Sequence, residues 1–536
     1  MAALFAALVV AGSAKSQQLS PNVSTYVFHL MLPDTGEQVR GVADLALGGG
    51  RESLPDTLSL DLIGLTVDSV KGTEIDLSWP LPFSYDGRRI RIALTAAGMR
   101  KTGSLLVFYH GTPRDGLIVG STMRGRRAFF GDNWPQRARY WLPTRDDPSN
   151  KARVFFQVET GPRWRVIANG SPQGCRPVRH GATRRVCDWL ETHPIPTYTM
   201  VIGAGEFTVS NHRPIIHGRD TIPIQVWAYA EDSAFADSVP FKNATEIVET
   251  MERLVGPFPY EKLAHVESST KFGGMENSSA IFYAERPYVE RRMGEGVVRH
   301  ETAHQWFGDA VTPRHFHHLW LSEGFASYFD LVVGAALHGD SVLKNGMRHD
   351  ADSYMSSNVV DRPILDTTVT EYVTLLNANN YPKGAWVLHM LRGLVSDSAF
   401  FRGIREYYRR YRDSTALSDD FRSVMEEVSG RDLEWFFRQW LRQPGYPQLD
   451  VAWQPQGPGR VRLDVTQTQP AGWGVFRFPR LFVEFRAADG RTLRRVYSVE
   501  GRVSVLFADL PFTPDQITVD PDGALLLKTT VRTRTP

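Results

Sequence analysis

The sequence His-Glu-Thr-Ala-His at positions 300–304 places two imidazoles four residues apart. An α-helix turns once in about 3.6 residues, so His300 and His304 would project from one face and could bind a single metal ion. Glu301 would stand beside that ion, where a carboxylate can act as a general base. The pattern is typical of zinc hydrolases, whose catalytic zinc has three protein ligands and leaves one position for water.

The third ligand is predicted at Glu323, which follows the two histidines within a Trp-Leu-Ser-Glu-Gly run. Two histidines and one carboxylate are an established ligand set for catalytic zinc. The competing metzincin pattern requires glycine at position 307 and histidine at position 310, where this chain has Phe307 and Ala310. The sequence therefore predicts one Zn²⁺ per chain, held by His300, His304 and Glu323.

Apolar residues surround both parts of this predicted metal site. They flank the His-Glu-Thr-Ala-His run, and Gly308 and Pro313 follow it, which predicts a helix that ends there. They also recur around Glu323 over 319–337, which predicts a second, buried helix lying against the first. The alternative is an ordinary surface helix that bears two histidines, and the apolar surroundings disfavour it.

The composition bounds the class of protein. The chain has 536 residues with 42% hydrophobic content, enough for about three domains that each bury a core. Its 61 lysines and arginines balance 59 aspartates and glutamates, giving a formal net charge of +2. A near-neutral chain is not expected to bind a polyanion, so no nucleic-acid partner is predicted. The oligomeric state has no signature in the composition.

The first residues indicate export. Residues 1–17 read as a signal segment, with an apolar run over 1–14 that is too short to cross a bilayer as an anchor. The positive charges that usually begin such a signal are missing, and a frayed terminus is the alternative. From the signal segment we expect an exported protein, periplasmic or secreted. No other apolar run reaches membrane length, so we expect no stable membrane anchor.

Two cysteines, Cys175 and Cys187, flank the polar stretch 176–185, which reads as the tip of a β-hairpin. The two side chains could meet across its strands. In an oxidising compartment a disulfide is favoured, and the alternative is a pair of inert thiols.

The hydrophobic period changes twice along the chain. It alternates with period two from about residue 22 to 207, which predicts a first domain over 18–207; it becomes helical over 208–445 and alternates again over 446–536. We therefore predict a multidomain α+β protein with an N-terminal antiparallel β domain, a mainly helical catalytic domain and a C-terminal β-sandwich. A linker is expected at 443–447. One helix of the catalytic domain is expected to be capped by Ser418.

Two further segments carry residues suited to chemistry. The run Gly-Gly-Met-Glu-Asn at 273–277 has two glycines, where backbone can approach a ligand closely, followed by a carboxylate. The run Tyr-Pro-Lys-Gly-Ala at 381–385 puts a phenol at the start of an apolar helix.

With these segments, the chain resembles the aminopeptidase N family of zinc metallopeptidases, the gluzincin aminopeptidases that include the leukotriene hydrolase and bacterial relatives. The resemblance extends from about residue 22, and four ordered motifs carry it, at 273–277, 300–309, 320–326 and 381–385. It implies a thermolysin-like catalytic domain and a zinc-dependent aminopeptidase acting on peptides with a free N-terminus.

The resemblance also implies individual roles. Glu301 would be the general base, Tyr381 would donate its hydroxyl to the oxyanion of the transition state, and Glu276 would bind the substrate's α-ammonium. An amine held so close to the metal lets only the first peptide bond reach it. The substrate-binding segment would be Gly273, Gly274, Met275, Glu276 and Asn277. The alternatives are a packing residue at Tyr381 and a structural turn over 273–277.

One departure from the family pattern concerns the N-terminal domain. Many members supply a second amine anchor from it, a Gln or a Glu, and the comparable stretch here offers only Asp132 or Asn133.

Two rival functions stay open at this point. A thermolysin-type zinc endopeptidase would share the metal ligands but would not need Glu276. A non-enzymatic, zinc-containing binding protein would need neither Glu301 nor Tyr381.

Overall fold

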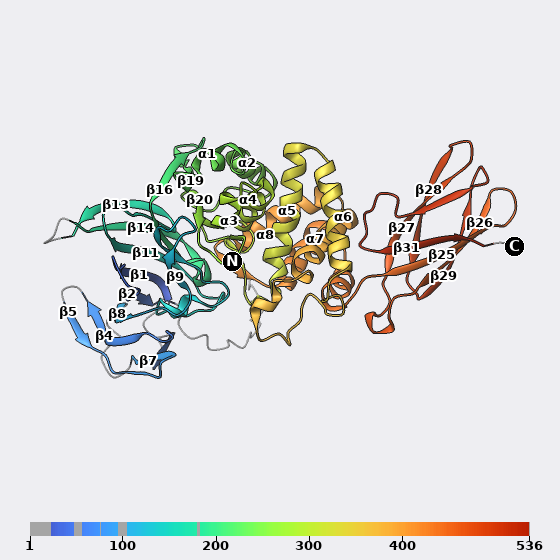
Figure 1. Ribbon diagram of the computed structural model, residues 1–536. Helices are drawn as coiled ribbons and strands as arrows, with labels where there is room; N and C mark the ends of the chain where they lie inside the picture. Colours follow the sequence, from blue (N-terminus) through green and yellow to red (C-terminus); the bar gives the residue numbers. More distant parts are fainter. Residues whose placement is uncertain (1–22, 48–55, 75–76, 95–103, 179–182, 535–536) are drawn as a thin grey trace, which may run out of the picture.

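The protein is built from three parts that follow one another along a long axis (Figure 1). The computed structural model describes residues 23–47, 56–74, 77–94, 104–178 and 183–534. A β-rich part comes first, a mainly helical part follows, and a second β-rich part ends the chain. The predicted architecture is confirmed. The predicted signal segment 1–17 lies outside the described residues, and the exact domain boundaries stay predictions.

The N-terminal part consists of three sheets. Its strands are β1 (Val23–Met31), β2 (Val39–Leu47), β3 (Thr57–Asp61), β4 (Thr66–Glu74), β5 (Leu77–Pro80), β6 (Phe83–Tyr85), β7 (Arg89–Ala93), β8 (Ser104–Gly111), β9 (Leu117–Ser121), β10 (Arg127–Gly131), β11 (Lys151–Thr160), β12 (Arg165–Ala168), β13 (Ser171–Pro177), β14 (Arg185–Pro196) and β15 (Ile202–Gly205). The eight-stranded sheet has the order β13-β14-β11-β1-β2-β8-β4-β5, the four-stranded sheet β12-β15-β10-β9, and the three-stranded sheet β3-β7-β6. All neighbours run antiparallel except β1 and β11, which are parallel. Alternation places Tyr26, Phe28 and Leu30 in the core.

The hairpin β13–β14 carries the two cysteines. Cys175 pairs with Cys187 in its register, with Cα atoms 4.1 Å apart, and their sulfurs form a disulfide. The favoured prediction of a disulfide across a hairpin is confirmed.

The middle part contains both strands and helices. Its strands are β16 (Phe207–Asn211), β17 (Ile215–His217), β18 (Asp220–Ile222), β19 (Ile224–Tyr229), β20 (Leu263–Ser268), β21 (Gly274–Met275), β22 (Ala280–Ala284), β23 (Val311–Pro313) and β24 (Ser414–Ala416). Its helices are α1 (Ser233–Ser238), α2 (Ala244–Leu254), α3 (Glu285–Val289), α4 (Glu295–His304), α5 (Trp320–His338), α6 (Ser341–Met355), α7 (Gly384–Val395), α8 (Asp397–Tyr411), α9 (Ser418–Ser429) and α10 (Glu434–Phe437).

The start of the middle part corrects one prediction. A helical period was expected from residue 208, but 207–284 is built around a five-stranded sheet with the order β16-β19-β20-β22-β21. Strands β19, β20 and β22 run parallel to one another. Every residue of β20 is buried, because both faces of this part of the sheet are covered. A strand buried on both faces shows no alternation, so period alone does not distinguish it from a buried helix.

Helices α4 and α5 form the framework of the predicted metal site, and they pack against each other as predicted. Trp306, Trp320 and Phe325 are fully buried around them. Helix α5 agrees with the expected 319–337 within one residue at each end.

The expected cap at Ser418 is wrong. Ser418 is the first residue of α9, and the carboxylate of Asp420 accepts a hydrogen bond from the backbone N–H of Leu417 instead. The hydroxyl of Ser418 accepts a hydrogen bond from the indole N–H of Trp320, at 2.8 Å. A serine before an apolar helical pattern can either cap the helix or bind a distant residue, and the sequence does not distinguish the two. In the structure Ser418 binds Trp320.

The C-terminal part is the predicted β-sandwich. Its strands are β25 (Gln448–Pro455), β26 (Arg460–Gln467), β27 (Phe478–Arg486), β28 (Thr492–Val499), β29 (Val503–Asp509), β30 (Gln516–Val519) and β31 (Lys528–Thr533). A four-stranded sheet, β29-β26-β25-β31, and a three-stranded sheet, β28-β27-β30, share a core that includes Val451, Leu463 and Phe485. The predicted linker is packed against the helical part, since the N–H of Gly445 donates to the carbonyl of Val360 at 2.8 Å.

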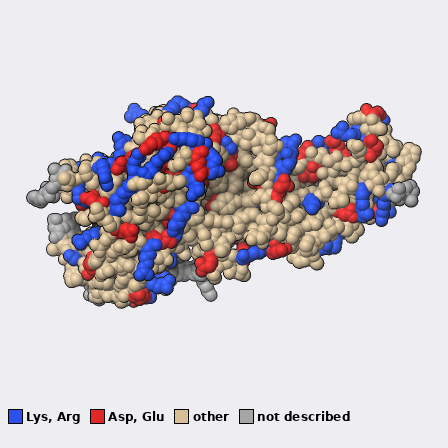
Figure 2. All heavy atoms as spheres, in the orientation of Figure 1, with Lys and Arg blue, Asp and Glu red and all other residues tan. Residues whose placement is uncertain are grey.

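Acidic and basic side chains are interspersed over the face of the molecule drawn in Figure 2. Within the described ranges, none of the helices has the length and apolar character needed to span a bilayer.

Candidate active site

The three predicted metal ligands converge at the junction of α4 and α5. The Nε2 atoms of His300 and His304 lie 3.1 Å apart. An oxygen of Glu323, Oε2, lies 3.2 Å from Nε2 of His304 and 3.4 Å from Nε2 of His300. Tetrahedral zinc with bonds of about 2.0–2.1 Å separates its ligand atoms by roughly 3.3–3.4 Å. The spacing of the three donor atoms therefore suits zinc.

The hydrogen bonds around the ligands also indicate a cation. Nδ1 of His304 lies 3.1 Å from the carbonyl oxygen of Phe307 and 3.0 Å from the hydroxyl of Ser322. A carbonyl only accepts, so we assign the imidazole proton to Nδ1, which leaves the lone pair of Nε2 facing the other ligands. Oε2 of Glu323 is buried and has no hydrogen-bond partner. Acceptor atoms that face one another in this way need a positive ion between them, and His300, His304 and Glu323 fit that requirement.

The electrostatics of the cluster agree with this interpretation. Burial lowers the pKa of His304, but the carboxylates of Glu323 and Glu276 outweigh it and raise that pKa to about 10. Burial raises the pKa of Glu323, but His304 and His300 outweigh it and lower that pKa to about 2. The surroundings of the cluster thus stabilise positive charge at its centre.

Glu301 lies on α4 beside this cluster and is almost completely buried. Burial raises the pKa of its carboxyl group well above the ordinary value, and Glu276 and Glu323 add to the effect while His304 opposes it. A Cβ atom added to Gly274 would overlap the carboxylate of Glu301. Only glycine therefore lets strand β21 approach this carboxylate so closely.

Strand β21 brings the predicted substrate-binding segment to the cluster. It pairs antiparallel with β22, and no other described strand pairs with it, so it forms the edge of the sheet. Oxygen and nitrogen atoms of Glu276, Glu301 and His304 lie within 4.8 Å of one another. The pKa of Glu276 is raised to about 7, mainly because the carboxyl group is buried. His304 lowers this pKa, and the nearby carboxylate of Glu323 raises it.

Gln305 fixes this segment to the end of α4. Its side-chain oxygen accepts a hydrogen bond from the N–H of Ser279 at 2.7 Å. Its amide nitrogen donates to the carbonyl of Glu276 and to the carboxylate of Asp309, both at 2.9 Å. This fully buried side chain was not predicted. Its position directly after His304 is the only signal in the sequence that could have identified it.

Tyr381 forms another side of the site. It lies in a π-helical turn, Asn379–Lys383, that leads into α7. Its ring stacks on the imidazole of His300, with ring centroids 5.9 Å apart and planes 6° from parallel. Burial raises the pKa of its hydroxyl well above the ordinary value, and the carboxylates of Glu323 and Glu276 raise it further.

These side chains surround a hollow of about 240 Å³. It is lined by Trp134, Phe272, Gly273, Gly274, Met275, Glu276, His300, Glu301, His304, Glu323, Leu376 and Tyr381. The structure thus brings together the predicted site residues except Asn277, which is fully buried and does not line the hollow. Trp134 from the N-terminal part and Leu376 from the segment before α7 were not predicted.

Asp132 and Asn133, the two residues considered for a second amine anchor, are not among the residues that line the hollow. Both are fully buried. The carboxylate of Asp132 pairs with the guanidinium of Arg137 at 2.8 Å. The amide of Asn133 donates to the carbonyl of Met200 at 2.6 Å and accepts from the indole of Trp141 at 2.8 Å. Their polar groups are already used in holding the N-terminal part together.

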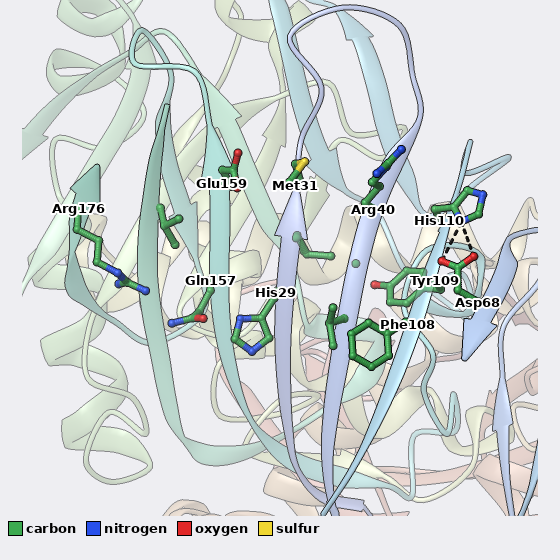
Figure 3. Close-up of a pocket in the computed structure, with 14 residues that line it drawn as sticks. His29, Met31, Arg40, Asp68, Phe108, Tyr109, His110, Gln157, Glu159 and Arg176 are labelled. Atoms are coloured by element: carbon green, nitrogen blue, oxygen red, sulfur yellow. Dashed lines mark hydrogen bonds and ion pairs between the residues drawn. The ribbon is translucent and has the colours of Figure 1, made fainter. Parts of the chain in front are cut away.

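A larger hollow, of about 550 Å³, lies on the eight-stranded sheet of the N-terminal part (Figure 3). Figure 3 shows His29, Arg40 and Gln157 along it and an ion pair between His110 and Asp68, whose atoms are 2.9 Å apart. Across the described ranges, two groups of three side chains could hold a metal ion, and both belong to the smaller hollow: His300, His304 and Glu323, and Glu276, Glu301 and His304. The smaller hollow is therefore the candidate active site.

Comparisons with known proteins agree with this assignment. Residues 240–440 match the model of the peptidase family M1 domain. The chain is 29% identical to the probable aminopeptidase 2 of Sulfurisphaera tokodaii and 26% identical to the leucyl aminopeptidase of Saccharolobus solfataricus, in each case over 75% of this chain and 51% of the relative. It is 27% identical to the glutamyl aminopeptidase of Bitis rhinoceros, over 65% of this chain and 37% of the relative. The chain thus spans about half or less of the length of these relatives.

The fold has solved counterparts. The crystal structure of the M1 zinc metallopeptidase from Deinococcus radiodurans superposes with a TM-score of 0.67 and 24% identity, covering 80% of this chain and 95% of that one. Residues 240–440 are therefore similar to the peptidase family M1 domain, and the relatives that this part of the chain resembles are aminopeptidases. The resemblance inferred from the four motifs is confirmed.

Proposed function

We propose that the protein is a zinc-dependent aminopeptidase that removes the N-terminal residue from peptides. His300, His304 and Glu323 would hold one zinc ion per chain. The observation that carries the proposal is Glu276, a buried carboxylate in the same hollow, within 4.8 Å of atoms of Glu301 and His304. The relatives named as leucyl and glutamyl aminopeptidases support it. So does a variant of the Deinococcus radiodurans protein, which has been solved bound to a Tyr-Ser-Ala substrate.

Zinc in such a site lowers the pKa of a bound water and polarises the scissile carbonyl. The chain's own residues move the protons. Glu301 accepts a proton from the attacking water and delivers it to the nitrogen of the leaving amine, which requires a carboxylate at this position. The hydroxyl of Tyr381 donates a hydrogen bond to the carbonyl oxygen as that oxygen gains negative charge.

The same hollow sets which bond is cut. The carboxylate of Glu276 accepts hydrogen bonds from the substrate's α-ammonium. The free edge of β21 offers backbone groups along which an extended peptide could add as a further strand. Because the ammonium is held beside the zinc ligands, only the first peptide bond reaches Glu301.

Blocking the substrate's amine tests this proposal. We expect hydrolysis of leucyl amide and no measurable hydrolysis of its N-acetyl form. Glu276→Ala should raise the KM for the free amide by about 10–100-fold, because a charge-assisted hydrogen bond contributes about 1.5–3 kcal/mol. Glu371→Ala is the matched control, since it removes an exposed carboxylate that does not line the hollow.

The two rival functions give different results in this assay. A thermolysin-type endopeptidase would cleave an N-acetylated peptide as readily as the same peptide with a free amine, and Glu276→Ala would leave this lack of preference unchanged. A binding protein without catalytic activity would hydrolyse no aminoacyl amide while still retaining zinc. Either result would contradict the proposed function.

We also propose that the protein is exported to the periplasm or secreted. The disulfide between Cys175 and Cys187 supports this location, because such bonds persist in oxidising compartments. The apolar start of the chain supports it as well. Cell fractionation with N-terminal sequencing should find a processed chain outside the cytoplasm. An unprocessed cytoplasmic chain would contradict it.

A further inference from the structure

Beside Glu276, the wall of the hollow is apolar. Trp134, Phe272, Met275 and Leu376 line it. Trp134 and Phe272 meet edge to face, with ring centroids 6.1 Å apart, and Trp134 also meets Phe316 at 5.7 Å. These contacts hold the Trp134 ring in place, so the wall is preformed and comes from both the N-terminal part and the middle part.

Among the described residues that line the hollow, none is a lysine or an arginine. The nearby cations are held elsewhere. The guanidinium of Arg137 lies over the ring of Phe272, with its carbon 5.6 Å from the ring centroid, and pairs with Asp132 at 2.8 Å and Asp115 at 3.0 Å. Lys271 pairs with Asp115 as well, at 2.9 Å. Of the charged side chains that line the hollow, Glu276 and Glu301 are the carboxylates outside the predicted ligand set.

We propose that this apolar wall receives the side chain of the substrate's first residue, so that the enzyme prefers large apolar N-terminal residues and rejects acidic ones. The inference rests on the proposed function. An acidic side chain would enter the hollow next to Glu276 and Glu301 and would find no cation to replace its lost water. A leucine or phenylalanine side chain would instead bury its apolar surface against the rings.

Identity to the relatives does not decide this question, because the leucyl and glutamyl aminopeptidases match at 26% and 27%. The residues that line the hollow distinguish a preference for leucine from one for glutamate, since a site that binds a glutamate side chain needs a cation or several hydrogen-bond donors directed into it.

Three amides test the proposal on the wild-type protein. We expect kcat/KM to fall from leucyl to glutaminyl to glutamyl amide, with leucyl at least about 100-fold above glutamyl. The glutamine side chain has nearly the same shape as that of glutamate but no charge, so glutaminyl amide separates the effect of the negative charge from the effect of side-chain shape. Equal values for leucyl and glutamyl amide would overturn the inference.

A cation placed in the wall should change the preference. Leu376→Lys should shift the glutamyl-to-leucyl ratio of kcat/KM at least about tenfold toward glutamyl, since it supplies the missing partner. Val373→Lys is the matched control, because Val373 is exposed on the short 3-10 helix Tyr372–Leu375, which directly precedes Leu376, and does not line the hollow. A ratio that stays the same in both variants would show that the first side chain binds elsewhere.

The failure of this inference differs from the failure of the proposed function. If all three free amides are cleaved at similar rates and their acetylated forms are not, the aminopeptidase stands and the apolar subsite is wrong. If the acetylated forms are cleaved as well, or if none is cleaved, both proposals fall. Because the wild-type ratio is measured first, the inference is tested even if the lysine variant does not fold.

Discussion

Replacing Glu301 by glutamine is expected to lower kcat by about 10²–10⁴-fold. Glutamine has the same shape and keeps the buried contact with Gly274, but its amide does not accept a proton from water. The predicted zinc ligands are unchanged, so the zinc content should stay that of the wild type. The measurements are kcat on leucyl amide and metal analysis of the same sample.

The matched control for this variant is Glu295→Gln on the same helix. Glu295 pairs with Arg299 and His338 and does not line the hollow, so its replacement should leave kcat within about twofold of the wild type. Turnover near the wild-type value in Glu301→Gln would remove Glu301 from its assigned role. Loss of zinc in that variant would instead assign the carboxylate to the metal site.

Replacing His304 by alanine is expected to abolish both zinc binding and turnover. His304 is the most buried of the three predicted ligands, and its imidazole is held by Phe307 and Ser322. Removing only an outer partner of a metal ligand costs about 10–100-fold in affinity, so loss of the ligand itself should cost more. Metal content after dialysis, measured together with the far-ultraviolet circular dichroism, checks this expectation without relying on activity.

His318→Ala is the control for the second variant. His318 lies between α4 and α5, and its Nδ1 contacts the hydroxyl of Ser418 at 2.8 Å instead of the metal cluster. We expect that variant to keep its zinc. If His304→Ala retained its zinc, or if His318→Ala lost it, the zinc would have to bind at a different place.

The core of the site could be predicted from the sequence because its geometry is local. The two histidines lie four residues apart on one helix, so their convergence follows from the helical repeat alone. Glu323 required one more step, the packing of α5 on α4, and the apolar residues around it indicated that packing. The side chains at 276 and 381 were placed through the family motifs, and the structure brings both into the same hollow.

The rest of the site depends on contacts between distant segments. Trp134 reaches the hollow from the N-terminal part, and no periodicity in its own segment indicates this. The sequence did not show whether Asp132 binds substrate or has a structural role. In the structure its carboxylate forms an ion pair with Arg137. The sheet of 207–284 was missed for a different reason, because strands buried on both faces lack an alternating pattern.

The most direct test is the metal content of the pure, active protein. The account predicts one zinc per chain, removal of that zinc by a chelator with parallel loss of hydrolysis of leucyl amide, and recovery of both when zinc is added back. An active preparation that contains no metal, or hydrolysis that persists after the metal has been removed, would contradict the account.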